Sequence, residues 1–515
     1  MILKILLVFF CLGYASTNIN TKQTILEKYV FSEFDRSIVK LDLLQVLPGN
    51  GFQTYLFNFT SLQWFTRRLS SRPIWWHYLL LTIPYNHDKT RPIFYYIDAG
   101  SNNETNPFSI YTNIISSFSV QCKCITVLHR QIPNQPILFP SDPTGQNRTE
   151  DAIIAYTLKL YLENKQQFID ETYNYVPLLF PMTKAVRRGF DEVIKFLNYE
   201  NIKFTKKFVV SGTSKRGWTT WLISAIDRRV TAFVPIVYDM VNIAKNLHRG
   251  YRSLGGAYTW AFFDYFATGS FLNIDTLNHQ RLFQLVDPYY YLNNYAGKQI
   301  YLVTAMNDQF FLPENTKSFW KELSTITNYK AYIRRVPNSG HNLSESLLRE
   351  VFSNVKTFFD LIKLETFSSQ RILPYFTWNL ENSENYGLIR TALSNINYFD
   401  SVLYKAHYAR TIDRSRIDFR IAFLTPNSTL QPSGFRWNQD IIGKQLLKEE
   451  NSVYKAGYKF INNFSTKYYI GFYIEADLKL KDSNETFVIC TDVDIVPNVY
   501  HVPDCFNRDC FTRLI

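Results

Sequence analysis

The middle of the chain alternates between short apolar runs and segments with helical periodicity. From about residue 75 to residue 360, the apolar runs have the length and composition of buried strands. These runs are WHYLLLTIP (76–84), IFYYIDAG (93–100), CITVLH (124–129), KFVVSG (207–212), VTAFVPIVY (230–238) and QIYLVTAM (299–306). Between them, residues 149–165 and 183–199 carry apolar side chains at three-to-four spacing, as amphipathic helices do. This alternation predicts a mostly parallel sheet with helices on both faces.

After about residue 365 the pattern changes to period two, with Asn, Ser, Pro and Gly between the alternating segments. These segments include RIDFRIAFL (416–424), YYIGFYIEADLKL (468–480) and TFVICTDVDIV (486–496). The change predicts a smaller antiparallel β domain over residues 366–515, of the β-sandwich type. The stretch LETFSSQRILP marks the boundary, which assigns residues 16–365 to the α/β domain. A chain of 515 residues is long enough for both.

The first residues have the features of a secretory signal peptide. Lys4 precedes an apolar run from Ile5 to Leu12, and small residues follow at Gly13 and Ala15. The run is too short to span a membrane, and no later segment is long and apolar enough to do so. We therefore predict a signal peptide over residues 1–15 and a secreted, extracellular protein without a membrane span.

Seven N-x-S/T sequons are consistent with a glycosylated surface in the secretory pathway. They begin at Asn58, Asn103, Asn147, Asn342, Asn427, Asn463 and Asn484. Cys11 would leave with the signal peptide, and five cysteines remain: Cys122, Cys124, Cys490, Cys505 and Cys510. In an oxidising compartment we expect one or two disulfides, one of them supplied by the three cysteines near the C-terminus, with the pairing left open. Residues 122–124 form a CxC without further ligands nearby, so we expect no metal site.

A formal net charge of +12 is compatible with anionic partners. Secretion argues against nucleic acid as a partner. The basic residues are spread thinly, with the densest groups near residues 215, 228 and 334, which favours solvated surface.

Ser214 lies where a nucleophilic serine would be expected, in the strand-turn-helix stretch FVVSGTSKRGW. A sharp turn from a strand to a helix lifts the side chain off the sheet and points the first amides of the helix at a developing negative charge. The usual pattern is G-x-S-x-G. Here Gly212 precedes the serine, but Arg216 occupies the second small position and Gly217 follows one residue later. An ordinary strand-to-helix turn is the alternative interpretation.

Two residues further along the chain are candidate partners for Ser214. Asp308 follows the run QIYLVTAM, and His341 lies in a turn after the short run YIRRV. The order of nucleophile, acid and histidine is that of the α/β-hydrolase fold. The alternative for each residue taken singly is a solvated loop position.

An oxyanion hole would need two backbone amides near Ser214. We expect one from Lys215 and the other from the loop after IFYYIDAG, where Ala99, Gly100, Ser101 and Asn102 are candidates and Ser101 is preferred. A plain glycine turn is the alternative. This chemistry requires no cofactor, and we expect none.

Many segments, in order, resemble the PhoPQ-activated pathogenicity-related proteins, a family that includes an autocrine proliferation repressor of social amoebae. These segments are WWHYLLLTIP, DAGSNN, HRQIPNQPILF, RTEDAIIAYTLKLYL, FPMTKAVRRGFD, VVSGTSKRGWTTWL, VTAFVPIVYDMVN, HRGYRSLGGAYTWAFFDY, DPYYYLNNY, MNDQFFLPENT and VPNSGH. The resemblance implies an α/β-hydrolase-like fold, with Ser214 as nucleophile, Asp308 as acid and His341 as base. It also implies that the spacing S-K-R-G-W is a family trait. The chain departs from the family pattern at Ala99 and Asn307, where glycines are usual.

An insertion at about residues 240–297 is rich in aromatic residues and glycines. In this fold such an insertion caps the site. The aromatic residues would suit an apolar or sugar-like substrate, although core packing is the preferred interpretation.

Two functions of different kinds follow from these observations. The first is a secreted serine hydrolase of an ester, amide or peptide bond, with a small-molecule or peptide substrate that the sequence does not identify. The second is an extracellular signalling protein that represses proliferation or repels cells, using the hydrolase scaffold to bind a cell-surface receptor or a secreted partner protein. A structural or adhesive glycoprotein is a third, weaker interpretation.

Overall fold

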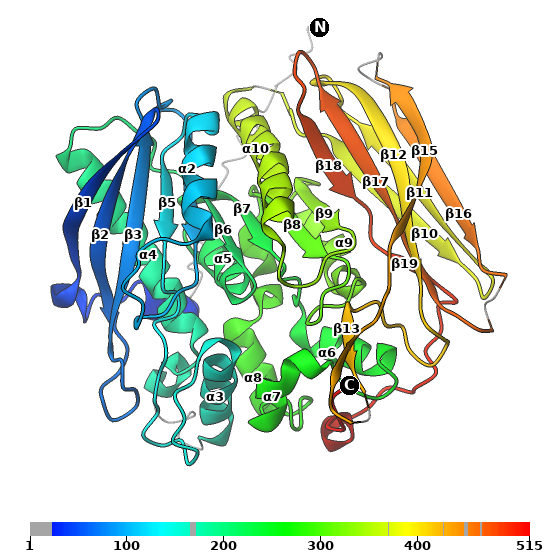
Figure 1. The fold of residues 1–515 in the computed structure, drawn as a ribbon, viewed down its shortest axis with the longest axis horizontal. Coiled ribbons are helices and arrows are strands. Elements are labelled where there is room, and N and C mark those ends of the chain that lie inside the picture. Colours follow the sequence, from blue (N-terminus) through cyan, green and yellow to red (C-terminus); the bar gives the residue numbers. More distant parts are fainter. Residues whose placement is uncertain (1–22, 165–170, 369, 426, 448–451, 464–465) are drawn as a thin grey trace, which may run out of the picture.

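A long mixed sheet of 14 strands runs through the molecule (Figure 1). The computed structural model describes residues 23–164, 171–368, 370–425, 427–447, 452–463 and 466–515. The predicted signal peptide over residues 1–15 lies outside the described residues. Along its main path the sheet has the order β1-β2-β3-β5-β4-β6-β7-β8-β9-β18-β17-β12-β15, and β19 pairs with β17.

The six strands at the centre, β5-β4-β6-β7-β8-β9, are parallel, and β1, β2 and β3 extend one side of the sheet as antiparallel strands. Their bounds are β1 Lys40–Gly49, β2 Phe52–Gln63, β3 Ile74–Pro84, β4 Ile93–Ile97, β5 Thr126–His129, β6 Phe208–Thr213, β7 Val230–Ile236, β8 Gln299–Ala305 and β9 Ala331–Val336. The six apolar runs chosen from the sequence correspond to β3, β4, β5, β6, β7 and β8, so the prediction that they form strands is confirmed. The alternation did not single out β1 and β2.

Helices cover both faces of the parallel strands, as predicted. The main ones are α1 Ile25–Val30, α2 Ile110–Cys122, α3 Glu150–Glu163, α4 Leu179–Tyr199, α5 Lys215–Ile226, α9 Trp320–Ile326 and α10 Glu345–Phe367. The side chains of strand β4 belong to two hydrophobic cores, one on each face of the sheet. Tyr95 packs with α4 and α5, while Phe94 and Tyr96, on the opposite face, pack with α2 and α10. Every residue of β4 is therefore apolar or aromatic and buried.

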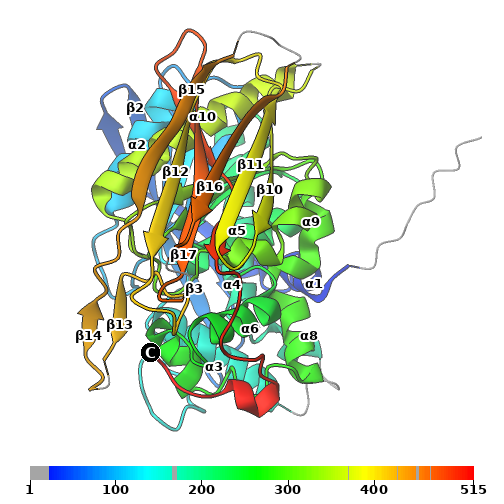
Figure 2. The ribbon, with the colours of Figure 1, turned by 90° about the vertical axis from the view of Figure 1, so that its right-hand side faces the viewer.

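The C-terminal part forms antiparallel sheets on the right-hand side of Figure 1, which faces the viewer in Figure 2. Strand bounds are β10 Tyr375–Asn382, β11 Tyr386–Ser394, β12 Phe399–Arg410, β15 Asn438–Leu446, β16 Tyr454–Ile461, β17 Ile470–Leu480, β18 Thr486–Cys490 and β19 Asp494–Val496. Strands β10, β11 and β16 form a separate sheet, whose Ile389 and Leu393 share a core with Phe472 and Ile474 of β17. The predicted antiparallel β region is therefore present, and the domain limits at residues 365 and 366 stay a prediction.

This antiparallel region is hydrogen-bonded to the parallel sheet. Cys490 of β18 pairs with Ile333 of β9, so β18, β17, β12 and β15 continue the large sheet beyond its last parallel strand. The Oη of Tyr301 in β8 also donates a hydrogen bond to the carbonyl of Val488, at 2.6 Å.

The segment 416–424 differs from its prediction as a strand. Its last three residues form β13 (Ala422–Leu424), which pairs with β14 (Leu430–Pro432), and residues 416–420 have no strand partner. The period-two burial is real, because Ile417 and Phe419 belong to a small core. The backbone bonds that would make a ladder go elsewhere: the amide of Ile417 donates to Ser253 of the insertion. Alternating burial alone cannot distinguish this extended packing segment from a strand.

The insertion near residues 240–297 folds into α6 (Ile243–Ser253), η4 (Trp260–Phe262), α7 (Phe263–Ala267), α8 (Leu277–Val286) and η5 (Pro288–Tyr295). Figure 1 shows α7 and α8 beside α3 at one end of the sheet. The C-terminal tail packs on the insertion through backbone bonds that join Tyr258 and Trp260 to Arg513 and Ile515. A stacked pair of rings, Phe266 and Phe511, with centroids 4.3 Å apart, adds to this contact. Of the helices within the described ranges, none combines the length and the apolar character needed to cross a membrane.

Candidate active site

Ser214 occupies a sharp turn between β6 and α5. Its backbone has φ 60° and ψ −126°, a conformation that non-glycine residues seldom adopt and that is found mostly where function requires it. The amide of Ser214 donates a hydrogen bond to the carbonyl of Ile236 on the neighbouring strand, at 2.8 Å. The turn therefore presents the hydroxyl at the carboxyl edge of the sheet.

The unusual glycine spacing has a steric explanation. A Cβ on Gly212 would lie 2.8 Å from the backbone oxygen of Arg216, and a Cβ on Gly217 would lie 2.9 Å from the Cβ of Tyr238. Helix α5 therefore approaches its neighbours most closely at these two positions. Arg216 has space for a side chain, and its guanidinium bonds to Glu150 at 2.6 Å.

The structure brings Ser214, His341 and Asp308 into one hydrogen-bonded row. The Oγ of Ser214 lies 2.7 Å from Nε2 of His341. On the other side of the ring, Nδ1 lies 2.8 Å and 3.0 Å from the two carboxylate oxygens of Asp308. Asp308 follows β8 and His341 follows β9, as the sequence predicted. With the proton on Nδ1 donated to Asp308, Nε2 is free to accept the proton of the serine.

Backbone and ring contacts hold the two partners of Ser214 in place. Asp308 also accepts hydrogen bonds from the amides of Phe310 and Phe311, at 2.7 Å and 3.2 Å. The ring of Phe310 lies 4.5 Å from that of His341, centroid to centroid. Asp308 and His341 are 2% and 7% exposed, so water has little access to the contact between them, whereas Ser214 is half-buried and lines a cavity.

A second carboxyl group, Asp239, lies behind the row and was not identified from the sequence. It comes three residues after the end of β7 and is 2% exposed. Burial, together with the negative charge of Asp308, raises the pKa of Asp239 to about 7. The Nδ2 of Asn315 donates to this carboxyl at 3.3 Å. Its position at the end of a central strand was the available sequence signal.

The two predicted oxyanion donors are placed differently. Lys215 begins α5, so its amide is among those that have no partner within the helix. Ser101 is oriented toward other groups: its carbonyl accepts from Nε2 of Gln131, and its Oγ donates to the carbonyl of Gln135. From the same loop, Ala99 lines the cavity that contains Ser214. The Ser101 amide as an oxyanion donor stays a prediction.

The two departures from the family pattern cause no backbone strain. Gly100 has φ +141° and provides the unusual turn of this loop, while neither Ala99 nor Asn307 has a positive φ. The side chain of Asn307 donates a hydrogen bond to the carbonyl of Phe419, at 2.7 Å. Asn307 thus ties the loop that carries Asp308 to the C-terminal region.

A charged cluster borders the site beside α3. Glu150 and Asp151 open α3, and the Nζ of Lys215 lies 2.6 Å and 3.0 Å from their carboxylates. Burial alone would raise the pKa of Glu150, but the positive charges of Arg216 and Lys215 lower it well below its usual range. The Nε of Arg216 also donates to the carbonyl of Ile132. These contacts fix α3 against the turn that carries Ser214.

Two cavities meet at Ser214. The wider one, of about 400 Å³, is lined by polar and charged groups that include Asp98, Glu150, His341 and Asn342. The smaller one, of about 50 Å³, extends between α3, α5 and the insertion. Aromatic and aliphatic side chains make up most of its wall: Leu158, Trp218, Tyr238, Met240, Ile243, Phe262, Tyr265, Phe271, Leu282, Phe283, Val286, Phe310 and Phe311. Aromatic residues of the insertion, interpreted from the sequence mainly as core, therefore also line a cavity at Ser214.

Six of the seven sequon asparagines are exposed, and Asn58 is half-buried on β2. Asn342 follows His341 directly and lines the wider cavity. The Oδ1 of Asn103 accepts a hydrogen bond from Arg72 at 2.7 Å. The occupancy of the sequons stays a prediction.

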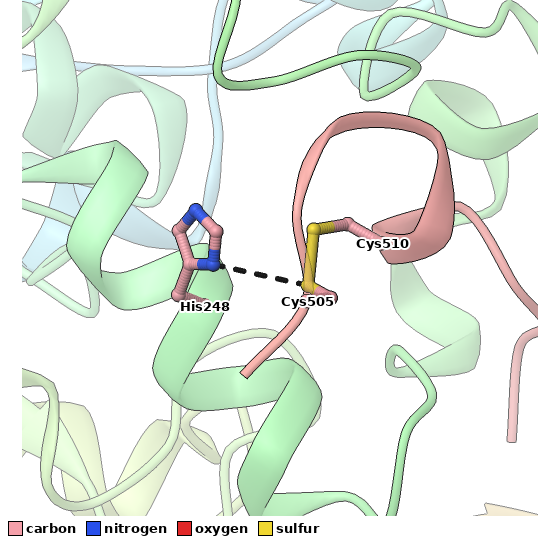
Figure 3. Close-up of side chains that lie close together, drawn as sticks. All are labelled: His248, Cys505 and Cys510. Carbon is pink, nitrogen blue, oxygen red and sulfur yellow. Dashed lines mark hydrogen bonds between the residues drawn. A yellow bond between two sulfur atoms is a disulfide. The ribbon is translucent and has the colours of Figure 1, made fainter. Parts of the chain in front are cut away.

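The predicted disulfide from the C-terminal cysteines is present, between Cys505 and Cys510 (Figure 3). Nδ1 of His248 lies 3.8 Å from the sulfur of Cys505, and these three residues are close enough to suggest a metal site. Because the two sulfurs are bonded to each other, neither is a thiolate ligand in this form. The imidazole of His248 instead bonds to Asp275 and Asp504, each at 2.8 Å. Cys122, Cys124 and Cys490 are buried free thiols.

Comparison with known proteins places the chain in a family. The model of the PhoPQ-activated pathogenicity-related protein family matches residues 26–420. The chain belongs to this family. It is 32% identical over 409 residues to autocrine proliferation repressor protein A of Dictyostelium discoideum, an alignment that covers 77% of this chain and 76% of that protein.

Among solved structures, the family member described here is similar to α/β-hydrolase esterases. Acetyl xylan esterase 1 from a Thermoanaerobacterium species has 13% sequence identity and a TM-score of 0.41, over 67% of this chain and 93% of that one. The glucuronoyl esterase of Solibacter usitatus has 12% identity and a TM-score of 0.37, over 65% and 90%. These similarities carry no statement about function. The predicted fold class is confirmed by the sheet itself, whose central strands are parallel and have helices on both faces.

Proposed function

We propose that this protein is a serine hydrolase that cleaves an ester, amide or peptide bond. The observation that carries the proposal is the hydrogen-bonded row of Ser214, His341 and Asp308, with distances of 2.7 Å and 2.8 Å along it. Those distances lie within the range expected for a nucleophile and its base. The positive φ of Ser214 supports the same role, since strain of this kind recurs at strand-to-helix nucleophile turns.

The proposed reaction proceeds in two steps. In the first, the oxygen of Ser214 bonds to the substrate carbonyl carbon while its proton passes to Nε2 of His341. The tetrahedral intermediate collapses as the bond to the leaving group breaks, and His341 returns the proton to that group. Water then attacks the acyl-serine by the same route and regenerates the hydroxyl. Asp308 orients His341 and stabilises its positive charge throughout.

The negative oxygen of the intermediate requires hydrogen-bond donors close to the turn that carries Ser214. We assign one of them to the amide of Lys215, at the start of α5. The loop of residues 99–101 provides the other, with the Ser101 amide as the donor expected from the sequence. Ala99 borders the cavity and is the competing candidate, although its amide donates a hydrogen bond to Oδ1 of Asp98, at 2.8 Å.

Labelling with a fluorophosphonate probe tests this proposal. We expect the probe to modify wild-type protein and to leave Ser214→Ala unmodified. Ser339→Ala is a matched control, since Ser339 is a buried serine in the same loop as His341 whose Oγ donates a hydrogen bond to the carbonyl of Gly340. Failure of folded wild-type protein to react, where known serine hydrolases react, would refute the proposal.

Secretion belongs to the same proposal. The disulfide between Cys505 and Cys510 supports it, because disulfides persist in oxidising compartments. The signal peptide over residues 1–15 and the seven glycosylation sites are the corresponding predictions from the sequence. Expression in a secretory host, followed by N-terminal sequencing and glycosidase treatment of the secreted protein, tests all three.

A second candidate function is extracellular signalling that restrains proliferation. The name of the Dictyostelium relative, autocrine proliferation repressor protein A, favours it. Addition of purified wild-type and Ser214→Ala protein to cells of the source organism separates the two functions. Growth inhibition that persists in Ser214→Ala would assign signalling to a binding surface, whereas its loss would make signalling depend on catalysis.

A further inference from the structure

The two cavities that meet at Ser214 differ in both size and chemistry. The wider cavity has His341 and Asn342 in its wall, together with charged groups. The smaller cavity has neither His341 nor Asn342 in its wall, which is mostly aromatic and aliphatic. A substrate bound across Ser214 would therefore place two chemically different parts on the two sides.

The position of His341 decides which part lies on which side. In a serine hydrolase the histidine protonates the leaving group, so the leaving group must lie on the side that His341 faces. That is the wider cavity, whose wall contains charged residues beside apolar ones such as Ile97 and Phe310. The acyl part, which remains bonded to Ser214, then extends into the smaller cavity.

The volume of the smaller cavity limits the acyl group. It measures about 50 Å³. This is small beside the about 400 Å³ of the wider cavity, so we expect the pocket to favour short acyl groups over long ones. The aromatic rings around it are packed against one another, as in the stacked pair Tyr265 and Phe271 with centroids 5.0 Å apart. The cavity cannot lengthen without displacing such rings.

Tyr238, one of the residues that line this wall, carries a buried hydroxyl without a protein partner among the described residues. The Oη of Tyr238 is buried, and within the described part of the chain no group lies within hydrogen-bonding reach of it. The tyrosine ring is held between Trp218 and Phe311, with centroids 5.0 Å and 5.4 Å away. The preceding residue, Val237, has φ 44°, which is rare for a β-branched residue. Strain and an unsatisfied hydroxyl at adjacent positions are expected where a ligand supplies the missing partner.

We propose that the smaller cavity is an acyl-binding pocket that takes a compact, mainly apolar acyl group, to which Tyr238 donates one hydrogen bond. The preferred substrates are then short-chain acyl esters or amides of a larger, polar leaving group. This inference rests on the proposed hydrolase function.

Hydrolysis of p-nitrophenyl esters of increasing chain length tests the size of the pocket. For the wild-type protein we expect kcat/KM to be about tenfold higher for the butanoate than for the octanoate, as the volume predicts. Phe271→Ala and Leu158→Ala enlarge the pocket from two different elements, so either variant should raise the octanoate-to-butanoate ratio about tenfold. Two variants are used because one may fold poorly, and fluorophosphonate labelling identifies the folded, reactive ones.

A pair of esters of equal size tests the hydroxyl. The 4-oxopentanoate offers a carbonyl acceptor where the 4-methylpentanoate has a methyl group. We expect Tyr238→Phe to lower the oxo-to-methyl ratio of kcat/KM about tenfold, as the loss of one buried hydrogen bond would. The ratio cancels the intrinsic reactivity of the two esters.

The outcomes separate the two proposals. Wild-type protein that hydrolyses octanoate as well as butanoate, or reactive enlarged variants with an unchanged chain-length ratio, would overturn the acyl pocket. An oxo-to-methyl ratio that is the same in Tyr238→Phe would overturn the role of the hydroxyl. Absence of both labelling and ester hydrolysis would instead overturn the hydrolase function on which the pocket depends.

Discussion

Replacement of Asp239 tests the electrostatics behind the candidate site. Burial and the charge of Asp308 raise the pKa of Asp239 from 3.8 to about 7. The folded protein therefore keeps a proton on this carboxyl below pH 7, whereas the unfolded chain loses it above about pH 4. Because the folded state binds the proton more tightly, the free energy of unfolding falls as the pH rises from about 4 to about 7. Above pH 7 the loss of unfolding free energy caused by ionised Asp239 is complete, and amounts to up to about 4 kcal/mol.

Asp239→Asn removes this titration and keeps the size of the side chain. We expect the stability of the variant, relative to wild type, to increase by about 2–3 kcal/mol between pH 5 and pH 8. Any effect of the amide that does not depend on pH cancels in this comparison. The assay is unfolding by urea at both pH values, followed by tryptophan fluorescence.

The control for this experiment is Asp482→Asn. Asp482 lies in an exposed turn with φ 53°, a conformation that asparagine also adopts readily. This variant makes the same carboxyl-to-amide change at an exposed position, away from the candidate site. A pH-independent difference for Asp239→Asn, or one that shrinks toward pH 8, would refute the inference that Asp239 is protonated in the folded protein.

Three further predictions concern the hydrogen-bonded row of Ser214, His341 and Asp308, the charged cluster beside α3, and the disulfide near the C-terminus. Asp308→Asn should lower kcat by about 10³–10⁴-fold without unfolding the protein, because the histidine would lose its orienting acceptor; steady-state kinetics and circular dichroism check this. Arg216→Ala removes the positive charge that pairs with the partly exposed Glu150, and should lower the free energy of unfolding by about 1–3 kcal/mol. Arg216→Lys should lower it by less. Thermal denaturation of both variants measures the difference. The double variant Cys505→Ser and Cys510→Ser should lose about 2 kcal/mol of stability, as expected for a disulfide that closes a loop of this length. It should also expose residues 497–515 to limited proteolysis. Equal cleavage rates in variant and wild type would contradict this prediction.

The parallel part of the fold was predictable because its signal is local. A strand buried on both faces must be apolar throughout, so runs such as IFYYI stand out against the helices between them. The antiparallel strands gave a weaker signal. Strand β1 is largely exposed, and residues 416–420 alternate in burial without belonging to a sheet. In both cases the neighbours that decide the state come from distant parts of the chain.

In the candidate site, too, some residues could be predicted from the sequence and others could not. Ser214, Asp308 and His341 could be named because each follows a recognisable strand, and the order of elements places strand ends at one edge. Asp239 and Tyr238 also follow such a strand, but nothing local distinguishes a buried polar side chain from a solvated one. The choice between Ala99 and Ser101 likewise depends on how one loop turns against Gln131 and Gln135.

The sequence by itself determined six strands and two helices of the α/β region, the family, and the positions of three polar residues at strand ends. Those features depend on periodicity and on short-range backbone geometry, which a sequence carries directly. The tertiary structure decided the rest: which aromatic residues of the insertion form core and which line the cavity, and how far Asp239 is removed from water. The disulfide pairing and the attachment of the C-terminal strands to β9 were decided in the same way. These features depend on distances between residues far apart in the chain, and a difference of an ångström or two separates a packed ring from a pocket wall.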